Sequence, residues 1–194
     1  LDSALYHFTV TVDDGEMGIT HVIRGEDHIS NTPKQILIYE ALGMSLPRFA
    51  HLPLLLGADR SKLSKRHGAT AVSMYRNDYL SDALFNFLAG TVFTFSTDIL
   101  SRDDMVKEFE LSRVHTSGAI FDTQKLNWLN ASYVKRMTPE AFAQYAGLED
   151  MSELGLRLVM ERLERLSDKE QYSYLWQEPV YDTRLFIWKN FSIE

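Results

Sequence analysis

The chain has 194 residues, of which 45% are hydrophobic and 24% charged, and its 27 acidic and 20 basic side chains give a formal net charge of −7. These values are typical of globular proteins and exclude collagen-like, low-complexity and fully disordered chains. The lack of cysteine excludes disulfides, thiolate metal sites and cysteine nucleophiles, and the acidic balance argues against a broadly basic surface for nucleic acid.

Alternating apolar and polar residues predict the first strands. The segment 5–13 has this pattern and so has 19–24, with a turn at 13–18 between them. The short apolar run 51–56 is typical of a buried parallel strand. The first 70 or so residues are therefore expected to form part of an α/β sheet.

A helix is predicted between the second and third of these strands. Asn31 or Thr32 can cap it, Pro33 suits its first turn, and Gly43 is a typical stop. A strand, a helix and a further strand in this order predict a crossover between parallel strands.

Beyond residue 71 the strand pattern gives way to helix signals. Ser101 and Thr138 are typical capping residues, and Gly90 and Gly147 are typical stops. The predicted helices cover 82–89, 103–109, 123–137, 139–146 and 154–166. The fold class is therefore α/β followed by mostly α.

The densest chemical signal is the loop 61–68, which follows the third predicted strand. It places three cations and two hydroxyl groups within six residues. Such a loop can hold the oxygens of a polyphosphate, and ligands of open α/β sheets bind beyond the carboxyl ends of strands. The alternative interpretation is a solvated basic turn.

A second polar cluster, Arg24–Gly25–Glu26–Asp27–His28, lies at the end of the second predicted strand. Arg24 can present its planar guanidinium to a carboxylate ligand. The alternative is a structural ion pair between Arg24 and Glu26 or Asp27. The histidines lack the spacing of a zinc site, so we expect no protein-bound metal.

Taken together, these segments resemble class I glutamyl-tRNA synthetases. The loop Lys62–Arg66 is similar to the KMSKS-type loop of that family. The segments that carry the resemblance are 21–35, 53–55, 62–69, 79–80, 83–84, 121–130, 181–182 and 187–189.

The resemblance implies a fold in three parts. The first is the C-terminal half of a Rossmann-like catalytic domain, followed by a helical stem-contact domain and the beginning of a helical anticodon-binding domain. The implied ranges are 1–72, 73–137 and 138–194.

The resemblance also implies a reaction. Glutamate and ATP would give glutamyl-adenylate and pyrophosphate, and the acyl group would then pass to tRNA(Glu). We expect Mg²⁺ to accompany ATP. We further expect a cytoplasmic monomer that does not bind membranes.

Site residues follow from the same resemblance, position by position. Lys62 and Lys65 would be the catalytic lysines. The ATP-binding residues would be Asp27, Leu55, Lys62, Leu63, Ser64, Lys65 and Arg66. The glutamate-binding residues would be Tyr6, His7, Phe8, Thr9, Val10, Arg24 and His28.

Departures from the family pattern set the remaining expectations. The family's H-x-G-H element does not occur in the sequence, and 90–97 differs from the usual stretch there. We therefore expect an internal fragment that lacks the N-terminal part of the catalytic domain and is inactive alone. Alternatives are a glutaminyl-tRNA synthetase, a tRNA-modifying glutamyl paralogue, or a non-catalytic tRNA-binding module.

Overall fold

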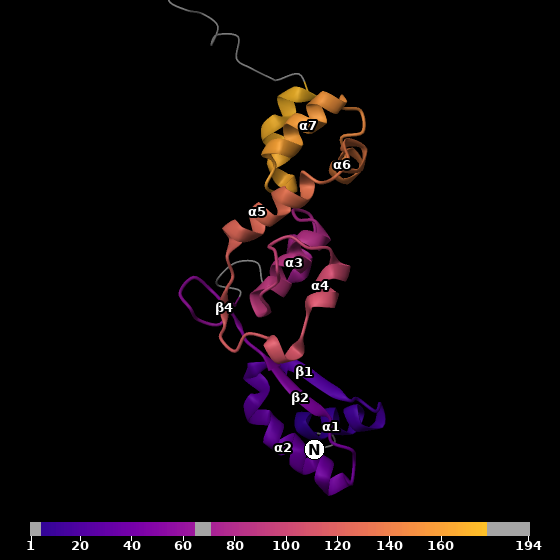
Figure 1. Ribbon diagram of the computed structural model, residues 1–194, viewed down its shortest axis with the longest axis vertical. Helices are drawn as coiled ribbons and strands as arrows, with labels where there is room; N and C mark the ends of the chain where they lie inside the picture. The colour runs from indigo at the N-terminus through magenta and orange to yellow at the C-terminus, as the bar shows by residue number, and fades with distance from the viewer. Residues whose placement is uncertain (1–4, 65–70, 178–194) are drawn as a thin grey trace, which may run out of the picture. The chain divides into compact units, whose positions relative to one another are not determined.

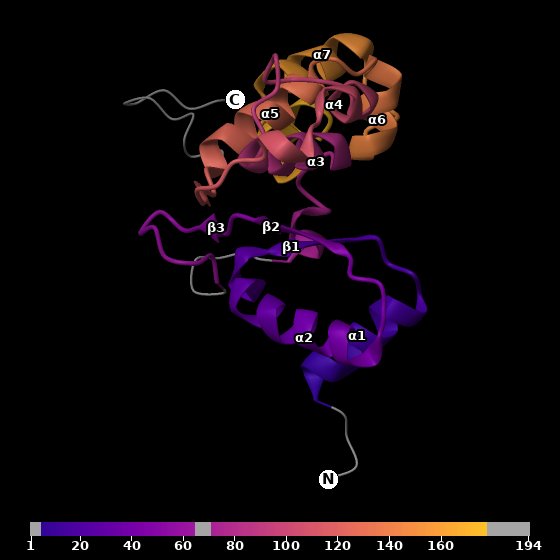
Figure 2. The same cartoon turned by 60° about the horizontal axis from the view of Figure 1, so that its bottom comes forward.

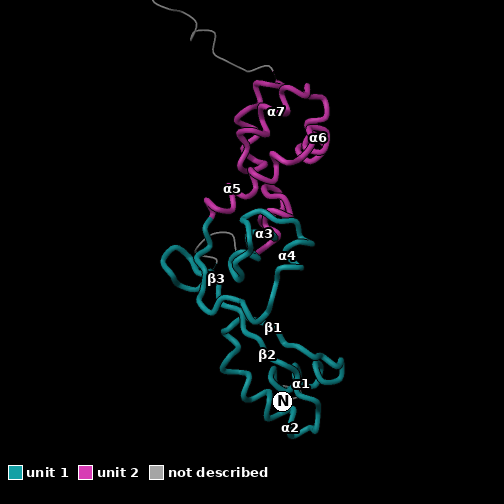
Figure 3. The backbone as a smooth tube through the Cα atoms, in the orientation of Figure 1, with its two compact units in different colours: residues 1–70, 85–122 teal, residues 71–84, 123–194 magenta. Residues whose placement is uncertain are grey.

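The computed structural model describes residues 5–64 and 71–177, and contacts within the chain divide it into two compact units (Figure 1 and Figure 3). Unit 1 comprises residues 1–70 and 85–122, and unit 2 comprises residues 71–84 and 123–194. All strands among the described residues belong to unit 1, whereas the described part of unit 2 consists of helices and turns. The expected order of α/β followed by mostly α is confirmed.

Fifteen helices, strands and 3₁₀ segments are assigned in the described residues. The strands are β1 (His21–Gly25), β2 (Arg48–Leu52), β3 (Leu55–Leu56) and β4 (Ala119–Ile120). The α-helices are α1 (Tyr6–Glu16), α2 (Thr32–Leu42), α3 (Ser81–Val92), α4 (Arg102–Glu108), α5 (Thr123–Val134), α6 (Pro139–Ala146) and α7 (Glu153–Arg162). The 3₁₀ segments are η1 (Glu26–Asn31), η3 (Val72–Tyr75), η4 (Leu111–Arg113) and η5 (Leu166–Leu175).

Two short parallel pairs of strands organise unit 1. β1 pairs directly with β2, with Arg24 in register with His51, and α2 connects the two strands along the chain. β3 pairs with β4. Helices α1 and α2 both lie on the same side of the β1–β2 pair (Figure 2). The predicted crossover between parallel strands is therefore confirmed.

The strand predicted over 5–13 is wrong, because these residues form α1. The Thr9 hydroxyl donates to the Leu5 carbonyl at 3.2 Å, and the Thr11 hydroxyl donates to the His7 carbonyl at 2.8 Å. Thr11 is also only 1% exposed. Burial against neighbouring elements and these bonds to carbonyls four residues earlier override the strand preference of a β-branched run.

The apolar run 51–56 is divided rather than continuous. β2 ends at Leu52, and β3 begins at Leu55. The break is held by the Leu54 amide, which donates to Glu26 Oε1 at 3.1 Å. The residues of this run are half-buried, not fully buried as predicted.

Capping residues are largely where the sequence places them. Gly43 and Gly147 follow α2 and α6 in the left-handed conformation, each with a φ of 67°. Ser101 accepts from the Asp104 amide at 3.1 Å, and Thr138 accepts from the Ala141 amide at 3.2 Å. These contacts satisfy amides that a helix start leaves without intrahelical partners.

Some helix boundaries differ from the prediction. α3 continues past Gly90, which does not have a positive φ, to Val92. α5 ends at Val134 and α7 at Arg162, each a few residues earlier than predicted. The apolar periodicity of a sequence does not determine where a helix ends, because the last turn depends on packing.

The core of unit 2 is formed mainly by α5, α6 and α7. The cluster of buried residues consists of Val134, Phe142, Ala143, Ala146, Leu148, Leu156, Val159, Met160 and Leu163. Asn130 is fully buried beside the chain segments that enter and leave this core. Its side chain accepts from the Leu80 amide at 2.9 Å and donates to the Glu164 carbonyl at 2.6 Å.

The units are defined by contacts within the chain. The division into domains at 72 and 137, which the family resemblance implies, stays a prediction.

Candidate active site

The candidate site is built on adjoining segments of unit 1. β1 ends in Arg24 and Gly25, η1 carries Asp27 and His28, and α2 begins at Thr32. The hairpin that follows β3 adds Lys62, because Lys62 pairs across the chain with Leu56. The two polar segments that the sequence singles out thus meet in one place.

Arg24 is half-buried and held by neutral groups. Its Nη2 donates to Thr32 Oγ1 at 2.8 Å and to Gln35 Oε1 at 2.7 Å. The guanidinium carbon lies 5.6 Å from the centre of the Phe49 ring. The guanidinium is therefore fixed in direction without losing its charge to a carboxylate.

The two carboxylates nearest to Arg24 in sequence bind elsewhere. Glu26 accepts from the Leu54 amide, and Asp27 pairs with Lys62. Among residues 5–64 and 71–177, Arg24 has no carboxylate partner. The structural alternative, in which Arg24 pairs with Glu26 or Asp27, is wrong.

Thr32 connects Arg24 to His51. The Thr32 hydroxyl lies 3.1 Å from His51 Nε2 and 3.2 Å from the His28 carbonyl. Burial lowers the pKa of His51 below its ordinary value, and the positive charges of Arg24 and His28 lower it further. His51 is thus favoured in its neutral form beside Arg24.

The residues predicted to bind glutamate from 6–10 lie on a helix, so they do not share the face that a strand would give them. Tyr6 turns toward η1, where its hydroxyl lies 3.5 Å from His28 Nδ1. His7 and Val10 are half-buried, whereas Phe8 and Thr9 are exposed. Of the residues predicted to bind glutamate, Tyr6 and His28 are therefore brought together.

Lys62 and Asp27, both predicted to bind ATP, contact each other. Lys62 Nζ lies 2.7 Å from Asp27 Oδ2. The hydrogen bond from Lys62 is the main cause of the lowered pKa of Asp27. The pair places one cation and one anion at the open side of the site.

The hairpin fixes the remaining described residues of the loop. Leu63 donates its amide to the Leu55 carbonyl at 2.8 Å, so the backbone oxygen of Leu55 is already bonded within the chain. Ser64 is half-buried after Leu63. Lys65 and Arg66, predicted to bind ATP, lie outside the described residues.

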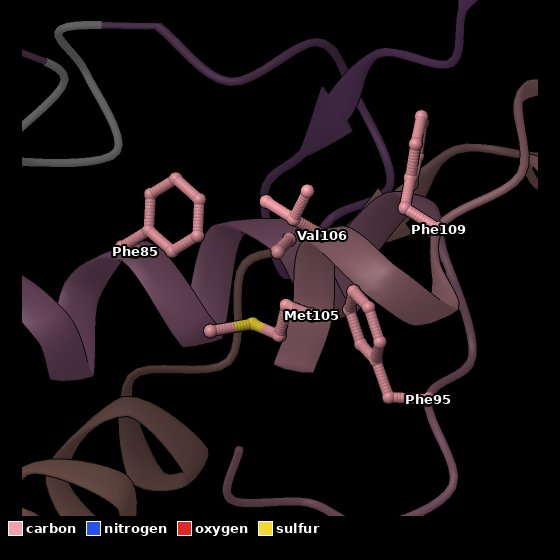
Figure 4. A pocket seen from close by; sticks show the side chains of 6 residues that line it. Phe85, Phe95, Met105, Val106 and Phe109 are labelled. Carbon is pink, nitrogen blue, oxygen red and sulfur yellow. The ribbon is translucent and has the colours of Figure 1, made fainter. Parts of the chain in front are cut away.

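A separate apolar cavity of about 280 Å³ lies in the later part of unit 1 (Figure 4). It is lined by Phe85, Ala89, Phe95, Met105, Val106 and Phe109. None of these side chains is polar, so the cavity offers no group for acid–base or phosphate chemistry. The polar site on β1, η1 and α2 is the stronger candidate for a catalytic function.

The described residues contain neither a cluster of metal ligands nor a helix that could span a membrane. No cluster of three or more potential His, Cys, Asp or Glu metal ligands occurs within 5–64 and 71–177. In those same ranges, no helix is sufficiently long and apolar to span a bilayer. The expected Mg²⁺ stays a prediction.

Three side chains around Arg24 are not among the predicted site residues, namely Thr32, Gln35 and Phe49. Thr32 and Gln35 are three positions apart on α2 and therefore share a helix face. Gln35 is 2% exposed and Tyr39, one turn later, is also 2% exposed, whereas Leu37 is 64% exposed. The signal in the sequence for this role of Gln35 is that a polar residue lies on the same helix face as Tyr39.

A family model for the catalytic domain of class I tRNA synthetases (E and Q) matches residues 2–128. The chain belongs to this family. The match includes every residue of the candidate site, from Tyr6 to the described part of the Lys62–Arg66 loop. The E and Q synthetase family is thus established for the part of the chain that contains the candidate site.

Curated relatives of this class I tRNA synthetase chain are glutamate–tRNA ligases. The protein of Thermodesulfovibrio yellowstonii is 58% identical over 137 residues, which are 70% of this chain and 29% of the relative. That of Aquifex aeolicus is 54% identical over 141 residues, which are 71% of this chain and 30% of the relative. The chain thus matches less than a third of each relative's length.

Solved structures agree with the family assignment. A glutamate tRNA ligase from Elizabethkingia meningosepticum, crystallised in complex with its amino acid, matches 96% of this chain and 44% of its own, with a TM-score of 0.78 and 32% identity. The glutamate-tRNA synthetase of Elizabethkingia anophelis matches 90% of this chain with a TM-score of 0.77. This chain therefore has the fold of the matched part of these E and Q family synthetases.

Proposed function

We propose that this chain supplies part of the active site of an ATP-dependent glutamate–tRNA ligase. The observation that carries the proposal is Arg24. It is a half-buried cation, held by Thr32 and Gln35, without a carboxylate partner among the described residues. A partly desolvated guanidinium of this kind is suited to bind an anionic ligand, and glutamate provides carboxylates.

The proposed chemistry needs no protein nucleophile. A carboxylate oxygen of glutamate attacks the α-phosphorus of ATP, the bond to the β-phosphate oxygen breaks, and pyrophosphate leaves. A ribose hydroxyl of tRNA(Glu) then attacks the acyl carbon of the adenylate, the acyl–phosphate bond breaks, and AMP leaves with the hydroxyl proton. Because charge develops on phosphate oxygens, fixed cations and substrate alignment supply the catalysis.

The assigned roles follow the family resemblance and the geometry of the site. Arg24 would bind glutamate beside Tyr6 and His28. Lys62 would contact phosphate after exchanging Asp27 for an ATP oxygen. Lys65, outside the described residues, would act with Lys62, and Mg²⁺ would accompany ATP.

The test uses a chimera, because the chain matches 29% of the Thermodesulfovibrio yellowstonii ligase. The matched segment of that enzyme is replaced by the corresponding residues of this chain. Glutamate-dependent exchange between ATP and pyrophosphate is measured, with glutamine and aspartate as alternative substrates. We expect exchange with glutamate, followed by aminoacylation of tRNA(Glu).

Arg24→Lys is the informative variant of this chimera. We expect the free energy of glutamate binding to weaken by about 2–4 kcal/mol, because a desolvated charge contact is lost. The KM for glutamate should therefore rise roughly 30- to 700-fold. The KM for ATP should stay nearly unchanged. Arg48→Lys, an exposed arginine at the start of β2, is the matched control.

Two results would contradict the proposal. One is an inactive chimera that folds normally beside an active parent ligase. The other is an equal loss of ATP and glutamate binding in Arg24→Lys, together with a lowered melting temperature, because that pattern indicates a structural arginine.

A further inference from the structure

The hydrogen bonds of Arg24 determine which of its atoms remain for a ligand. Nη2 carries two protons, and it makes two bonds, to Thr32 and to Gln35. No hydrogen bond to a described residue uses Nη1, and Nε is buried without a partner among those residues. A carboxylate cannot therefore take both Nη groups without displacing one of these holders.

Gln35 is placed for this contact by the start of α2. Pro33 lies in the first turn of the helix, and Thr32 and Gln35 follow the same face toward the end of β1. Gln35 is 2% exposed. Its Oε1 accepts from Arg24, whereas its Nε2 is buried without a partner among the described residues.

Thr32, the other acceptor of Arg24, makes hydrogen bonds whose donors and acceptors are fixed. The Thr32 hydroxyl has one proton to donate, and its oxygen accepts a hydrogen bond from Arg24. The His28 carbonyl can only accept, so the Thr32 proton is used there. His51 Nε2, at 3.1 Å, must then donate to Thr32, which requires the proton on Nε2.

We propose that Gln35 is a positioning residue for Arg24, and that its neutral amide keeps the guanidinium charge available for the substrate carboxylate. This inference rests on the proposed function. A neutral acceptor fixes the direction of Nη2 while leaving the net charge of the group at +1. A carboxylate at the same place would neutralise Arg24 and compete with an anionic ligand.

Gln35→Glu tests the role of neutrality. The substitution preserves the length of the side chain and its acceptor oxygen, but it adds a negative charge 2.7 Å from Arg24 Nη2. In the chimera described above, we expect the KM for glutamate to rise about tenfold or more, with kcat and the KM for ATP nearly unchanged. Gln124→Glu, an exposed glutamine on α5, is the matched control.

Gln35→Met tests the positioning role in the 194-residue chain itself. The methionine fills similar space but is a poor acceptor. Nitrogen-15 NMR of the guanidinium groups, with Arg24 assigned by the loss of its signals in Arg24→Lys, reports rotation about the Cζ–Nη bonds. We expect separate Nη signals in the wild type and their coalescence in Gln35→Met.

The outcomes separate the two proposals. If the chimera with wild-type Gln35 has no exchange activity, the proposed function fails. If exchange is present but Gln35→Glu behaves like Gln124→Glu, the charge argument is overturned. Unchanged Arg24 signals in folded Gln35→Met overturn the positioning role, and Gln35→Leu, which also lacks the acceptor oxygen, provides the same measurement if Gln35→Met does not fold.

Discussion

Lys62 Nζ lies 2.7 Å from Asp27 Oδ2, so two residues 35 positions apart, both expected to contact ATP, are paired with each other. Both side chains are substantially exposed, at 59% for Lys62 and 39% for Asp27. Exposed pairs of this kind exchange readily and add little to stability. Phosphate oxygens can therefore compete with Asp27 for Lys62.

Lys62→Ala in the chimera should lower the rate of adenylate formation by about 10²-fold, because a cation that contacts phosphate charge in the transition state is removed. The melting temperature should change little. Pre-steady-state kinetics measures the chemical step directly. Lys107→Ala is the control, since Lys107 forms an exposed pair with Asp104 that is also 2.7 Å long. Equal rates in the two variants would remove Lys62 from the catalytic machinery.

His51 should make the folded state sensitive to acid. Its pKa is lowered in the folded state, mainly by burial, so the unfolded chain binds a proton at higher pH than the folded chain. The contribution to stability is complete above the ordinary histidine range and is lost as the pH falls toward the lowered pKa. Urea unfolding between pH 7.5 and pH 5 measures this slope.

His51→Gln should reduce that slope, because the glutamine amide does not titrate in this range. His21→Gln, at the exposed start of β1, serves as the control and should preserve the slope of the wild type. If His51→Gln and the wild type lose stability in parallel, other groups cause the acid sensitivity.

Asn130→Leu should destabilise the protein by roughly 2–4 kcal/mol, because the Leu80 amide and the Glu164 carbonyl lose their part-buried bonds to the fully buried Asn130 side chain. Urea unfolding monitored by far-UV circular dichroism gives the difference. Ser132→Ala, two positions later on α5, removes only a bond to the Trp128 carbonyl of the same helix and should stay within about 0.5 kcal/mol of the wild type. A similar small effect for Asn130→Leu would mean that water replaces both contacts.

Thr138→Ala should cost about 1 kcal/mol, because the Ala141 amide loses its capping oxygen at the start of α6. Thr138→Ser retains that oxygen and should be close to the wild type. Thermal unfolding of the three proteins makes the comparison. Equal losses in the alanine and serine variants would point to the threonine methyl group rather than to the cap.

How far the sequence predicts the fold depends on the range of the interactions. The caps at Ser101 and Thr138 and the left-handed Gly43 are local, and all three are confirmed. The strand prediction for 5–13 is wrong, because packing of Thr11 decides between helix and strand. Local preference is weak where β-branched residues alternate with polar ones.

The candidate site divides in the same way. The polar clusters around Arg24 and Lys62 are visible in the sequence, and the structure brings them together. The contact of Gln35 with Arg24 depends on how α2 packs against β1, which spacing along the chain does not reveal. Side-chain hydrogen bonds between different elements are the part of a site that sequence patterns predict least.

The parallel pairing of β3 with β4 has a consequence for the order of events during synthesis. Leu55 pairs with Ala119, 64 positions later, and the Leu56 carbonyl accepts from the Phe121 amide. At about 5–20 residues per second, the ribosome needs roughly 3–13 s to make the intervening chain. For most of that interval, the hairpin that carries Lys62 has been made but its partner strand has not. The nascent chain must therefore keep an open strand edge from associating with other molecules before unit 1 is complete.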